Sequence, residues 1–435
     1  MDSFVYRGGQ LYAEGVSVRR IVGKVGTPAY IYSRATLLDH FGKVQKAFSS
    51  VPSLICYSVK ANSCLGVLAV LKKAGAGFDV VSAGELERVR RVGGRMDRVV
   101  FAGVGKTDAE LAAALRAGIL MFNVESEAEL CALDALAGKL LRARQIARPA
   151  RVALRVNPDV DPHTHAYITT GKKETKFGLD LETTARLLKT AARFRNLTVA
   201  GLHAHIGSQI TEVDPYREAL KKVVGFILEH RCEAAPLTYL NSGGGFGIYY
   251  QDRSAPPVER FARVMLPAIK ESGCTLLLEP GRFVCGNAGI LVTRITYVKH
   301  SGRKRFLIVD AGMNDLVRPS LYGAFHEIWP VQGAGPSPTR GGHRPPPSCV
   351  ADVVGPICES GDFLAKDRPL PKDLQRGDLL AIFSAGAYGR TMSSNYNTRP
   401  MCPEILVSGN AFAVATRRQT CADILACERV PKGVV

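Results

Sequence analysis

Apolar residues in much of this chain form short, β-branched runs separated by longer stretches rich in alanine and leucine. Between about residues 28 and 285, eight such runs follow one another: SLICYSVK, GFDVV, RVVFAG, LMFNV, RVALRVN, GLHAHIGS, LTYLNSGGG and CTLLLEPGR. Strands that alternate with helical stretches are typical of parallel βα units. Eight of them predict an α/β domain closed into a (β/α)8 barrel.

The pattern changes after residue 286. The runs there are alternating or continuously apolar with few helical stretches between them: ILVTRITYVKH, RFLIVDAG, DLLAIFSAG and EILVSG. The first residues, FVYRGGQLYAEGVSV, have the same character. We therefore expect a barrel domain at 28–285 and a mainly β domain formed by 1–27 and 286–435. A Pro/Gly-rich stretch at 333–347 is expected to be an exposed flexible loop.

Polar residues and glycines recur where the predicted barrel strands end. In (β/α)8 barrels, function concentrates at the C-terminal ends of the strands and in the loops that follow them. Packing does not explain so many polar groups on one rim, and we interpret them as a functional site. The positions are Lys60, Asp79, Asn157, His205, Gly243–Gly245, Glu279 and Arg282.

The glycines of NSGGGFG, after the seventh run, indicate a phosphate site. Backbone N–H groups there can approach a phosphate without obstruction, and barrel phosphate sites commonly use the loops after strands seven and eight. A phosphate site and Lys60 on one rim favour pyridoxal 5′-phosphate, whose aldehyde condenses with a lysine amine. Glu279 is placed to pair with the ring nitrogen, which must stay protonated, and His205 to stack on the ring.

Plainer interpretations stay open for some of these residues. Glycine clusters also form tight turns. His203 and His205 are two apart on one strand and share a face, so both can point inward. We assign the structural role to His203 because His205 lies later along the strand. The pair could also bind a metal, but no third ligand with suitable spacing is nearby, and we predict no metal site.

Composition narrows the class of protein. The 435 residues, 46% of them hydrophobic, are enough for two domains with extensive burial. The amino terminus lacks the apolar core of a signal peptide and no run is long enough to span a bilayer, so we expect a cytoplasmic protein without a membrane partner. Eleven cysteines without paired CxxC spacing argue against a disulfide framework or a structural zinc site.

The net charge of +18 is spread along the chain and is not interleaved with aromatic residues. This distribution does not favour nucleic-acid binding, and it suits small anionic ligands.

Several long motifs, in order along the chain, carry a specific resemblance. They are YSVKAN, FDVVSAGEL, GKKETKFGL, GLHAHIGSQ, NSGGGFGI, EPGR, MNDLVRPSLYGAFH, DVVGPICESGD and GAYGRTMSSNYNTRP. The chain resembles the diaminopimelate decarboxylases, within the alanine racemase-like class of barrel enzymes that use pyridoxal phosphate. This class also contains ornithine and arginine decarboxylases. The resemblance covers nearly the whole chain and implies a (β/α)8 barrel plus a mainly β C-terminal domain.

The resemblance implies a role for each matching residue. Lys60 would bind the cofactor and Cys358 would donate a proton. Residues implied in cofactor binding are Lys60, Asp79, His205, Ser208, Gly244, Gly245, Glu279 and Tyr388. Residues implied in substrate binding are Arg282, Arg318, Tyr322, Glu359 and Tyr388. Guanidinium groups suit the carboxylates of such a substrate because they form bidentate hydrogen bonds.

The implied reaction is decarboxylation of meso-2,6-diaminopimelate to L-lysine and CO2, the last step of lysine biosynthesis. Ornithine-type decarboxylases carry an aspartate after the equivalent of Cys358, suited to a distal ammonium. Glu359 stands there in this chain, and with Arg282 it fits a distal centre bearing both an amine and a carboxylate. The alternative is decarboxylation of ornithine, lysine or another basic amino acid on the same fold.

A non-enzymatic alternative is a catalytically dead relative with a binding or regulatory role. It predicts loss of the lysine, the glutamate or the cysteine, and Lys60, Glu279 and Cys358 are all present. The CESGD motif is expected to reach the active site of a neighbouring subunit. The expected assembly is therefore a homodimer with shared active sites.

Overall fold

The computed structural model describes residues 3–161, 176–230, 237–251, 255–333, 349–431 and 433. The chain divides into two compact units. The barrel unit comprises Leu38–Ile248 and Ser254–Val284, and the β unit comprises Met1–Leu37, Tyr249–Arg253 and Cys285–Val435. Among the helices in the described ranges, none has the length and apolar character that a bilayer crossing requires.

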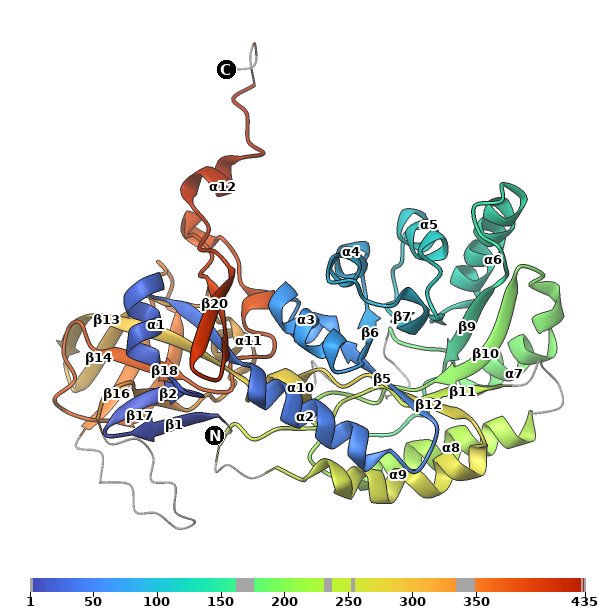
Figure 1. Ribbon diagram of the computed structural model, residues 1–435, viewed down its shortest axis with the longest axis horizontal. Helices are drawn as coiled ribbons and strands as arrows, with labels where there is room; N and C mark the ends of the chain where they lie inside the picture. The colour runs from blue at the N-terminus through green and yellow to red at the C-terminus, as the bar shows by residue number, and fades with distance from the viewer. Residues whose placement is uncertain are drawn as a thin grey trace. The chain divides into compact units, whose positions relative to one another are not determined.

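The barrel unit contains a closed barrel of eight parallel strands in the order β10-β11-β12-β5-β6-β7-β8-β9 (Figure 1). Each run predicted from the sequence is one of these strands, so the predicted (β/α)8 fold is confirmed. Their bounds are β5 Ser53–Ser58, β6 Gly77–Val80, β7 Val99–Phe101, β8 Met121–Val124, β9 Ala150–Arg155, β10 Leu197–His203, β11 Tyr239–Asn241 and β12 Thr275–Leu278.

Helices alternate with these strands. They are α2 Arg34–Ala47, α3 Leu65–Lys73, α4 Ala83–Arg91, α5 Asp108–Ala117, α6 Glu127–Arg142, α7 Leu181–Lys189, α8 Asp214–Glu229, α9 Val258–Ser272 and α10 Arg282–Cys285. Side-chain caps fix where several of them begin. Thr107 and Glu110 form a capping box at the start of α5, and Ser126 accepts a hydrogen bond from the Glu129 N–H at the start of α6.

An apolar cluster fills one level of the barrel interior. Its buried members are Leu120, which directly precedes β8, and residues of six barrel strands: Cys56, Val100, Met121, Ala153, Ala200 and Leu277. Side chains two apart on a strand share a face. The residues two positions after members of this cluster therefore also point into the barrel, nearer to the C-terminal ends of the strands. They include Asn123, Arg155 and Glu279, so the interior changes from apolar to polar at that level.

The β unit is built on a nine-stranded sheet with the main order β17-β16-β14-β13-β4-β19-β20, in which β18 also pairs with β13 and β15. Its strands are β4 Ala29–Ser33, β13 Gly289–Ser301, β14 Lys304–Val309, β15 Ile328–Pro330, β16 Cys349–Val354, β17 Phe363–Leu370, β18 Leu379–Ile382, β19 Glu404–Ser408 and β20 Ala411–Thr416. A separate three-stranded sheet contains β1 Phe4–Arg7, β2 Gln10–Ala13 and β3 Val16–Ser17. The short helices are α1 Val18–Val25, α11 Arg318–Tyr322 and α12 Cys421–Leu425.

We expected the barrel domain to begin at residue 28, but β4 belongs to the β unit. This strand pairs with β13 and β19 in the large sheet, not with the barrel. All five of its residues are buried, and helix α2 follows it, so its sequence has the same character as a βα unit of the barrel. Of the Pro/Gly-rich stretch at 333–347, residues 334–347 lie outside the described ranges.

Candidate active site

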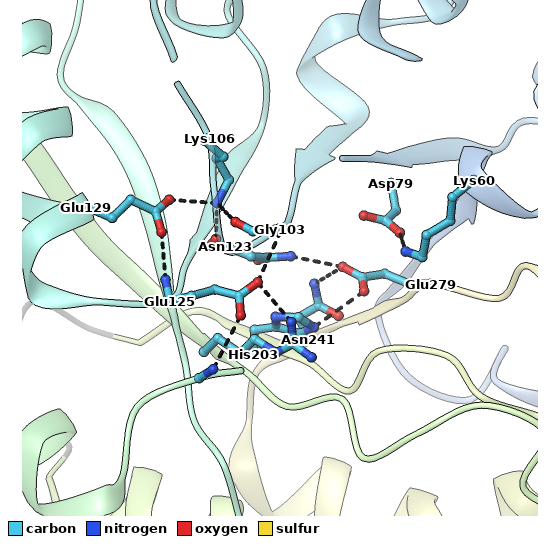
Figure 2. Close-up of polar contacts among 12 residues, drawn as sticks. Lys60, Asp79, Gly103, Lys106, Asn123, Glu125, Glu129, His203, Asn241 and Glu279 are labelled. Atoms are coloured by element: carbon cyan, nitrogen blue, oxygen red, sulfur yellow. Dashed lines mark hydrogen bonds and ion pairs between the residues drawn. The ribbon is translucent and has the colours of Figure 1, made fainter. Parts of the chain in front are cut away.

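Buried polar side chains collect at the C-terminal ends of the barrel strands (Figure 2). The pairing register places several of them level with one another: Ser58 is opposite Asp79, and His203 is opposite both Arg155 and Asn241. The barrel thus brings together groups that are far apart in sequence. The buried members are Ser58, Asp79, Asn123, Arg155, His203, Asn241 and Glu279.

Lys60 lies directly after β5, in the short 3-10 turn Val59–Ala61. Its Nζ donates a hydrogen bond to Oδ2 of Asp79 at 2.7 Å, and Ser58 Oγ donates to the same oxygen at 2.5 Å. The Lys60 side chain is 38% exposed, whereas that of Asp79 is fully buried. Burial and the charge of Glu279 raise the pKa of Asp79, and Lys60 acts against them. The structure therefore places an accessible amine against a buried carboxylate.

Glu279 directly follows β12 and is enclosed by donors. The side-chain N–H groups of Asn241 and Asn123 donate to its Oε1 at 2.6 and 3.0 Å. Nε2 of His203 lies 3.4 Å from Oε2, a distance that makes the contact electrostatic rather than a well-formed hydrogen bond. Burial raises the pKa of Glu279, but His203, Lys60 and Asn241 outweigh it and hold that pKa well below its usual value. The carboxylate is thus kept ionised.

His205 lies beyond the end of β10 and beside the glycine turn. Its Nδ1 accepts a hydrogen bond from the Gly244 N–H at 3.3 Å. Desolvation, followed by the charges of Arg155 and Lys60, lowers the pKa of His205 well below its usual value. The imidazole is therefore neutral at physiological pH.

The glycine turn after β11 has no room for side chains. A Cβ on Gly244 would lie 2.1 Å from the backbone oxygen of Glu279, and one on Gly245 would lie 2.4 Å from the backbone oxygen of Gly207. Gly243 has a φ of +65°, in the left-handed region that favours glycine. These glycines are thus required by close backbone packing and by conformation.

Ser208 and Arg282 meet on the same rim. Nη2 of Arg282 donates to Oγ of Ser208 at 3.0 Å, and Arg282 is only 7% exposed. Arg282 opens the short helix α10, immediately after the loop that carries Glu279.

The other candidate residues lie in the β unit. Cys358 and Glu359 are exposed and follow β16. The Cys358 N–H donates to Asn397 Oδ1 at 3.0 Å, and the Tyr396 hydroxyl donates to Glu359 Oε2 at 3.0 Å. Neither Tyr396 nor Asn397 was expected from the sequence, although both belong to the quoted motif GAYGRTMSSNYNTRP.

Arg318 and Tyr322 are the first and last residues of α11, and Tyr388 follows β18 with a φ of +54°. Arg318 is 7% exposed; its Nη1 lies 2.8 Å from Nε2 of His326, and its guanidinium lies 4.7 Å from the ring centre of Tyr250. This packing restricts the orientation of the guanidinium.

Sequence reasoning missed a buried polar network next to this site. Lys106, 1% exposed, donates from Nζ to Glu129 Oε1 at 2.6 Å and to the backbone oxygens of Gly103 and Asn123 at 2.8 Å. Arg155 pairs with Glu125 at 2.8 Å. Asn241 is the last residue of β11, so the strand-end rule that selected Lys60 and Glu279 would also have selected it, whereas Asn123 lies one residue before the end of β8.

These groups fit the cofactor that the sequence predicts. A pyridoxal phosphate site needs a lysine amine, an ionised carboxylate for the ring nitrogen and donors for the phosphate. The barrel unit provides an amine on its rim and a buried carboxylate with a lowered pKa, and the glycine turn predicted for the phosphate lies beside His205. In the described ranges, no group of three or more His, Cys, Asp and Glu side chains is arranged to hold a metal ion.

The fold and the site define a barrel enzyme of the pyridoxal-dependent decarboxylase class. Residues 34–286 match the family described as pyridoxal-dependent decarboxylase, pyridoxal binding domain. The diaminopimelate decarboxylase of Pseudomonas aeruginosa is 45% identical over 428 residues, which is 98% of this chain and 99% of the relative. The chain belongs to the diaminopimelate decarboxylase family, whose cofactor is pyridoxal 5′-phosphate.

Solved structures agree with this assignment. Diaminopimelate decarboxylase from Helicobacter pylori, complexed with L-lysine, is 36% identical with a TM-score of 0.86, and the match covers 94% of this chain and 98% of that one. The enzyme from M. jannaschii, in co-complex with L-lysine, is 33% identical with a TM-score of 0.90, and the match covers 100% and 99% of the two chains.

Proposed function

We propose that this chain decarboxylates meso-2,6-diaminopimelate to L-lysine and CO2, with pyridoxal 5′-phosphate, as the last step of lysine biosynthesis in the cytoplasm. The observation that carries the proposal is the buried, ionised Glu279 on the same barrel rim as Lys60. Full-length relatives named diaminopimelate decarboxylase, two of them solved with L-lysine, support the choice of substrate.

In this proposal the cofactor supplies an electron sink, and the barrel residues bind and orient it. Lys60 would attach it, and the contact of Lys60 with Asp79 supports this role because it fixes the amine at the rim. Glu279 would accept a hydrogen bond from the ring nitrogen, and the neutral His205 would stack on the ring. The remaining residues proposed to contact the cofactor are Asp79, Ser208, Gly244, Gly245 and Tyr388.

The substrate residues are proposed to orient the bond that breaks. Arg282, Arg318 and Tyr322 would hold carboxylates, and the buried setting of both guanidinium groups supports this because it limits their motion. By fixing the orientation of the substrate, these residues would select which bond at the α carbon breaks and so favour decarboxylation over racemisation. Glu359 would bind the distal amine, and Tyr388 would also contact substrate.

Cys358 is proposed to donate a proton to the α carbon after the carboxylate has left it. Cys358→Ala should then lower turnover far more than it lowers cofactor affinity, and unchanged turnover would remove Cys358 from the mechanism. Lys60→Ala should abolish covalent attachment of the cofactor.

A homodimer with shared active sites belongs to the same proposal. The exposure of Cys358 and Glu359 supports it, because a neighbouring subunit would enclose them. Mixing inactive K60A and C358A subunits tests it. If each site uses Lys60 of one subunit and Cys358 of the other, the mixture regains roughly a quarter of the wild-type activity, since about half of the dimers are mixed and each of these has one intact site of two. No recovery after verified exchange would contradict shared sites.

The test of the function is CO2 release by the cofactor-loaded protein from meso-diaminopimelate and, in parallel, from ornithine and lysine. Turnover of diaminopimelate alone is expected. Turnover of ornithine or lysine would instead support the alternative, a decarboxylase of basic amino acids, and would reverse the role given to Glu359. A protein without the visible absorbance of lysine-bound cofactor would refute both.

A further inference from the structure

Glu279 is held by side chains that have no assigned role in this protein. Asn123 and Asn241 come from β8 and β11, and both donate to the same oxygen, Oε1 (Figure 2). Both asparagines are fully buried and Glu279 is 6% exposed. Hydrogen bonds from two neutral donors to one buried charged acceptor are strong and directional.

The orientation of the Asn123 amide is set by Glu279. Its Oδ1 is buried and has no hydrogen-bond partner among the described residues, whereas its Nδ2 reaches Glu279 at 3.0 Å. Turning the amide over would direct Oδ1 at a carboxylate and create repulsion. The orientation in which Nδ2 donates to Glu279 therefore leaves Oδ1 of Asn123 buried without a hydrogen bond among the described residues. Fold stability alone does not favour this arrangement.

A second network fixes the backbone from which Asn123 extends. The buried Lys106 donates to the backbone oxygen of Asn123, and its pair with Glu129 holds the amine in place. On the other strand, Oδ1 of Asn241 accepts from the Gly243 N–H at 3.0 Å. Asn241 thus connects Glu279 to the glycine turn, and each asparagine is fixed at a second point.

We propose that Asn123 and Asn241 are positioning residues for Glu279, which hold its carboxylate in one orientation as the acceptor for the ring nitrogen of the cofactor. The inference rests on the proposed function only through the role of Glu279. Both asparagines bind Oε1, whereas Oε2 lies 3.4 Å from Nε2 of His203.

The sharpest test compares two variants of Asn123, since among the described residues its side chain makes one hydrogen bond, to Glu279. Asn123→Ala removes the donor at every pH. Asn123→Asp keeps the shape but adds a carboxylate; above the pKa of the resulting pair, two negative charges face each other, and below it the shared proton restores a donor. The measurement is cofactor affinity from absorbance titrations across pH, expressed as the ratio of each variant to the wild type.

We expect N123A to bind the cofactor about tenfold or more weakly at all pH values, because a hydrogen bond to a charged group is lost. N123D should bind more weakly still at high pH and return toward wild-type affinity as pH falls. The matched control is Asn196→Ala. Asn196 likewise donates to an acidic residue, with two hydrogen bonds from Nδ2 to Asp134, and it lies just before β10, away from the strand ends that carry Glu279.

Circular dichroism of each variant verifies folding, and N123D carries the test if N123A does not fold. Wild-type affinity for both variants, or a ratio for N123D that does not change with pH, would overturn the inference. A wild-type protein that binds the cofactor but releases no CO2 from diaminopimelate would refute the proposed function alone, because these binding ratios do not depend on the substrate.

Discussion

The glycine turn allows a prediction whose magnitude follows from the structure. In Gly244→Ala the new Cβ would lie 2.1 Å from the backbone oxygen of Glu279, 2.8 Å from its carbonyl carbon and 3.3 Å from Cα of Pro280. All three atoms belong to the backbone, so no side-chain rotation relieves the clash. One strand end must move, and the hydrogen bond from the Glu279 N–H to the Gly243 oxygen, 2.7 Å long, is the first to be strained.

Overpacking of this kind costs about 1–3 kcal/mol when side chains can adjust, so a backbone clash should lower the free energy of unfolding by about 3 kcal/mol or more. The matched control is Gly225→Ala in the interior of α8, where no heavy atom lies within 4 Å of the added Cβ. There the alanine should stabilise the protein by about 0.5–1 kcal/mol, because glycine is a poor helix former.

Urea unfolding of the cofactor-free protein, followed by circular dichroism, measures both changes. Absorbance titration with the cofactor then reports whether the displaced strand end weakens binding, which we expect for G244A and not for G225A. If G244A unfolds at the same urea concentration as the wild type and binds the cofactor equally well, the close approach of the two backbones is wrong.

Three further predictions concern single contacts. Tyr396→Phe removes the hydrogen bond to Glu359 and should raise KM for diaminopimelate about two- to tenfold without changing the absorbance of the bound cofactor; an unchanged KM contradicts the contact. Burial raises the pKa of Glu85 from 4.5 to about 7. As pH rises from about 4.5 to about 7, Glu85 of the unfolded chain loses its proton before Glu85 of the folded protein does, so the wild type should lose stability over this range. In thermal melts at about pH 5 and about pH 8, the Glu85→Gln variant should lack this contribution. Lys106→Met leaves the charge of the buried Glu129 without its ion-pair partner and should lower the free energy of unfolding in urea by about 3–5 kcal/mol. Adding Glu129→Leu should restore most of this loss. Unchanged stability of the single variant would refute a contribution from the pair.

The barrel could be predicted from the sequence because parallel strands are covered on both faces and therefore form continuous apolar runs. The same property explains why the boundary expected at residue 28 groups β4 with the barrel. AYIYS is central in a large sheet, is buried throughout and precedes a helix, so local pattern does not distinguish it from a barrel strand. Only its partners, β13 and β19, separate the two cases, and they lie far away in the sequence.

The partners of individual site residues depend on register, which no local pattern contains. The pairing of Ser58 with Asp79 across β5 and β6 brings Asp79 within reach of Lys60. From the sequence, both residues could be placed on one rim, but their ion pair could not be predicted, because a shift by one residue would turn Asp79 to the other face.

The two-residue period of the strands accounts for the inward positions of Asn123 and Asn241. Met121 belongs to the interior cluster and Tyr239 packs against it, so the residues two positions later face the same interior. Applied to these two runs, this step selects Asn123 and Asn241. The period alone does not say where a strand stops, and therefore cannot separate His203 from His205. Backbone pairing of His203 with Asn241 keeps His203 inside the barrel beside Glu279, and leaves His205 beyond the last pair, next to the glycine turn.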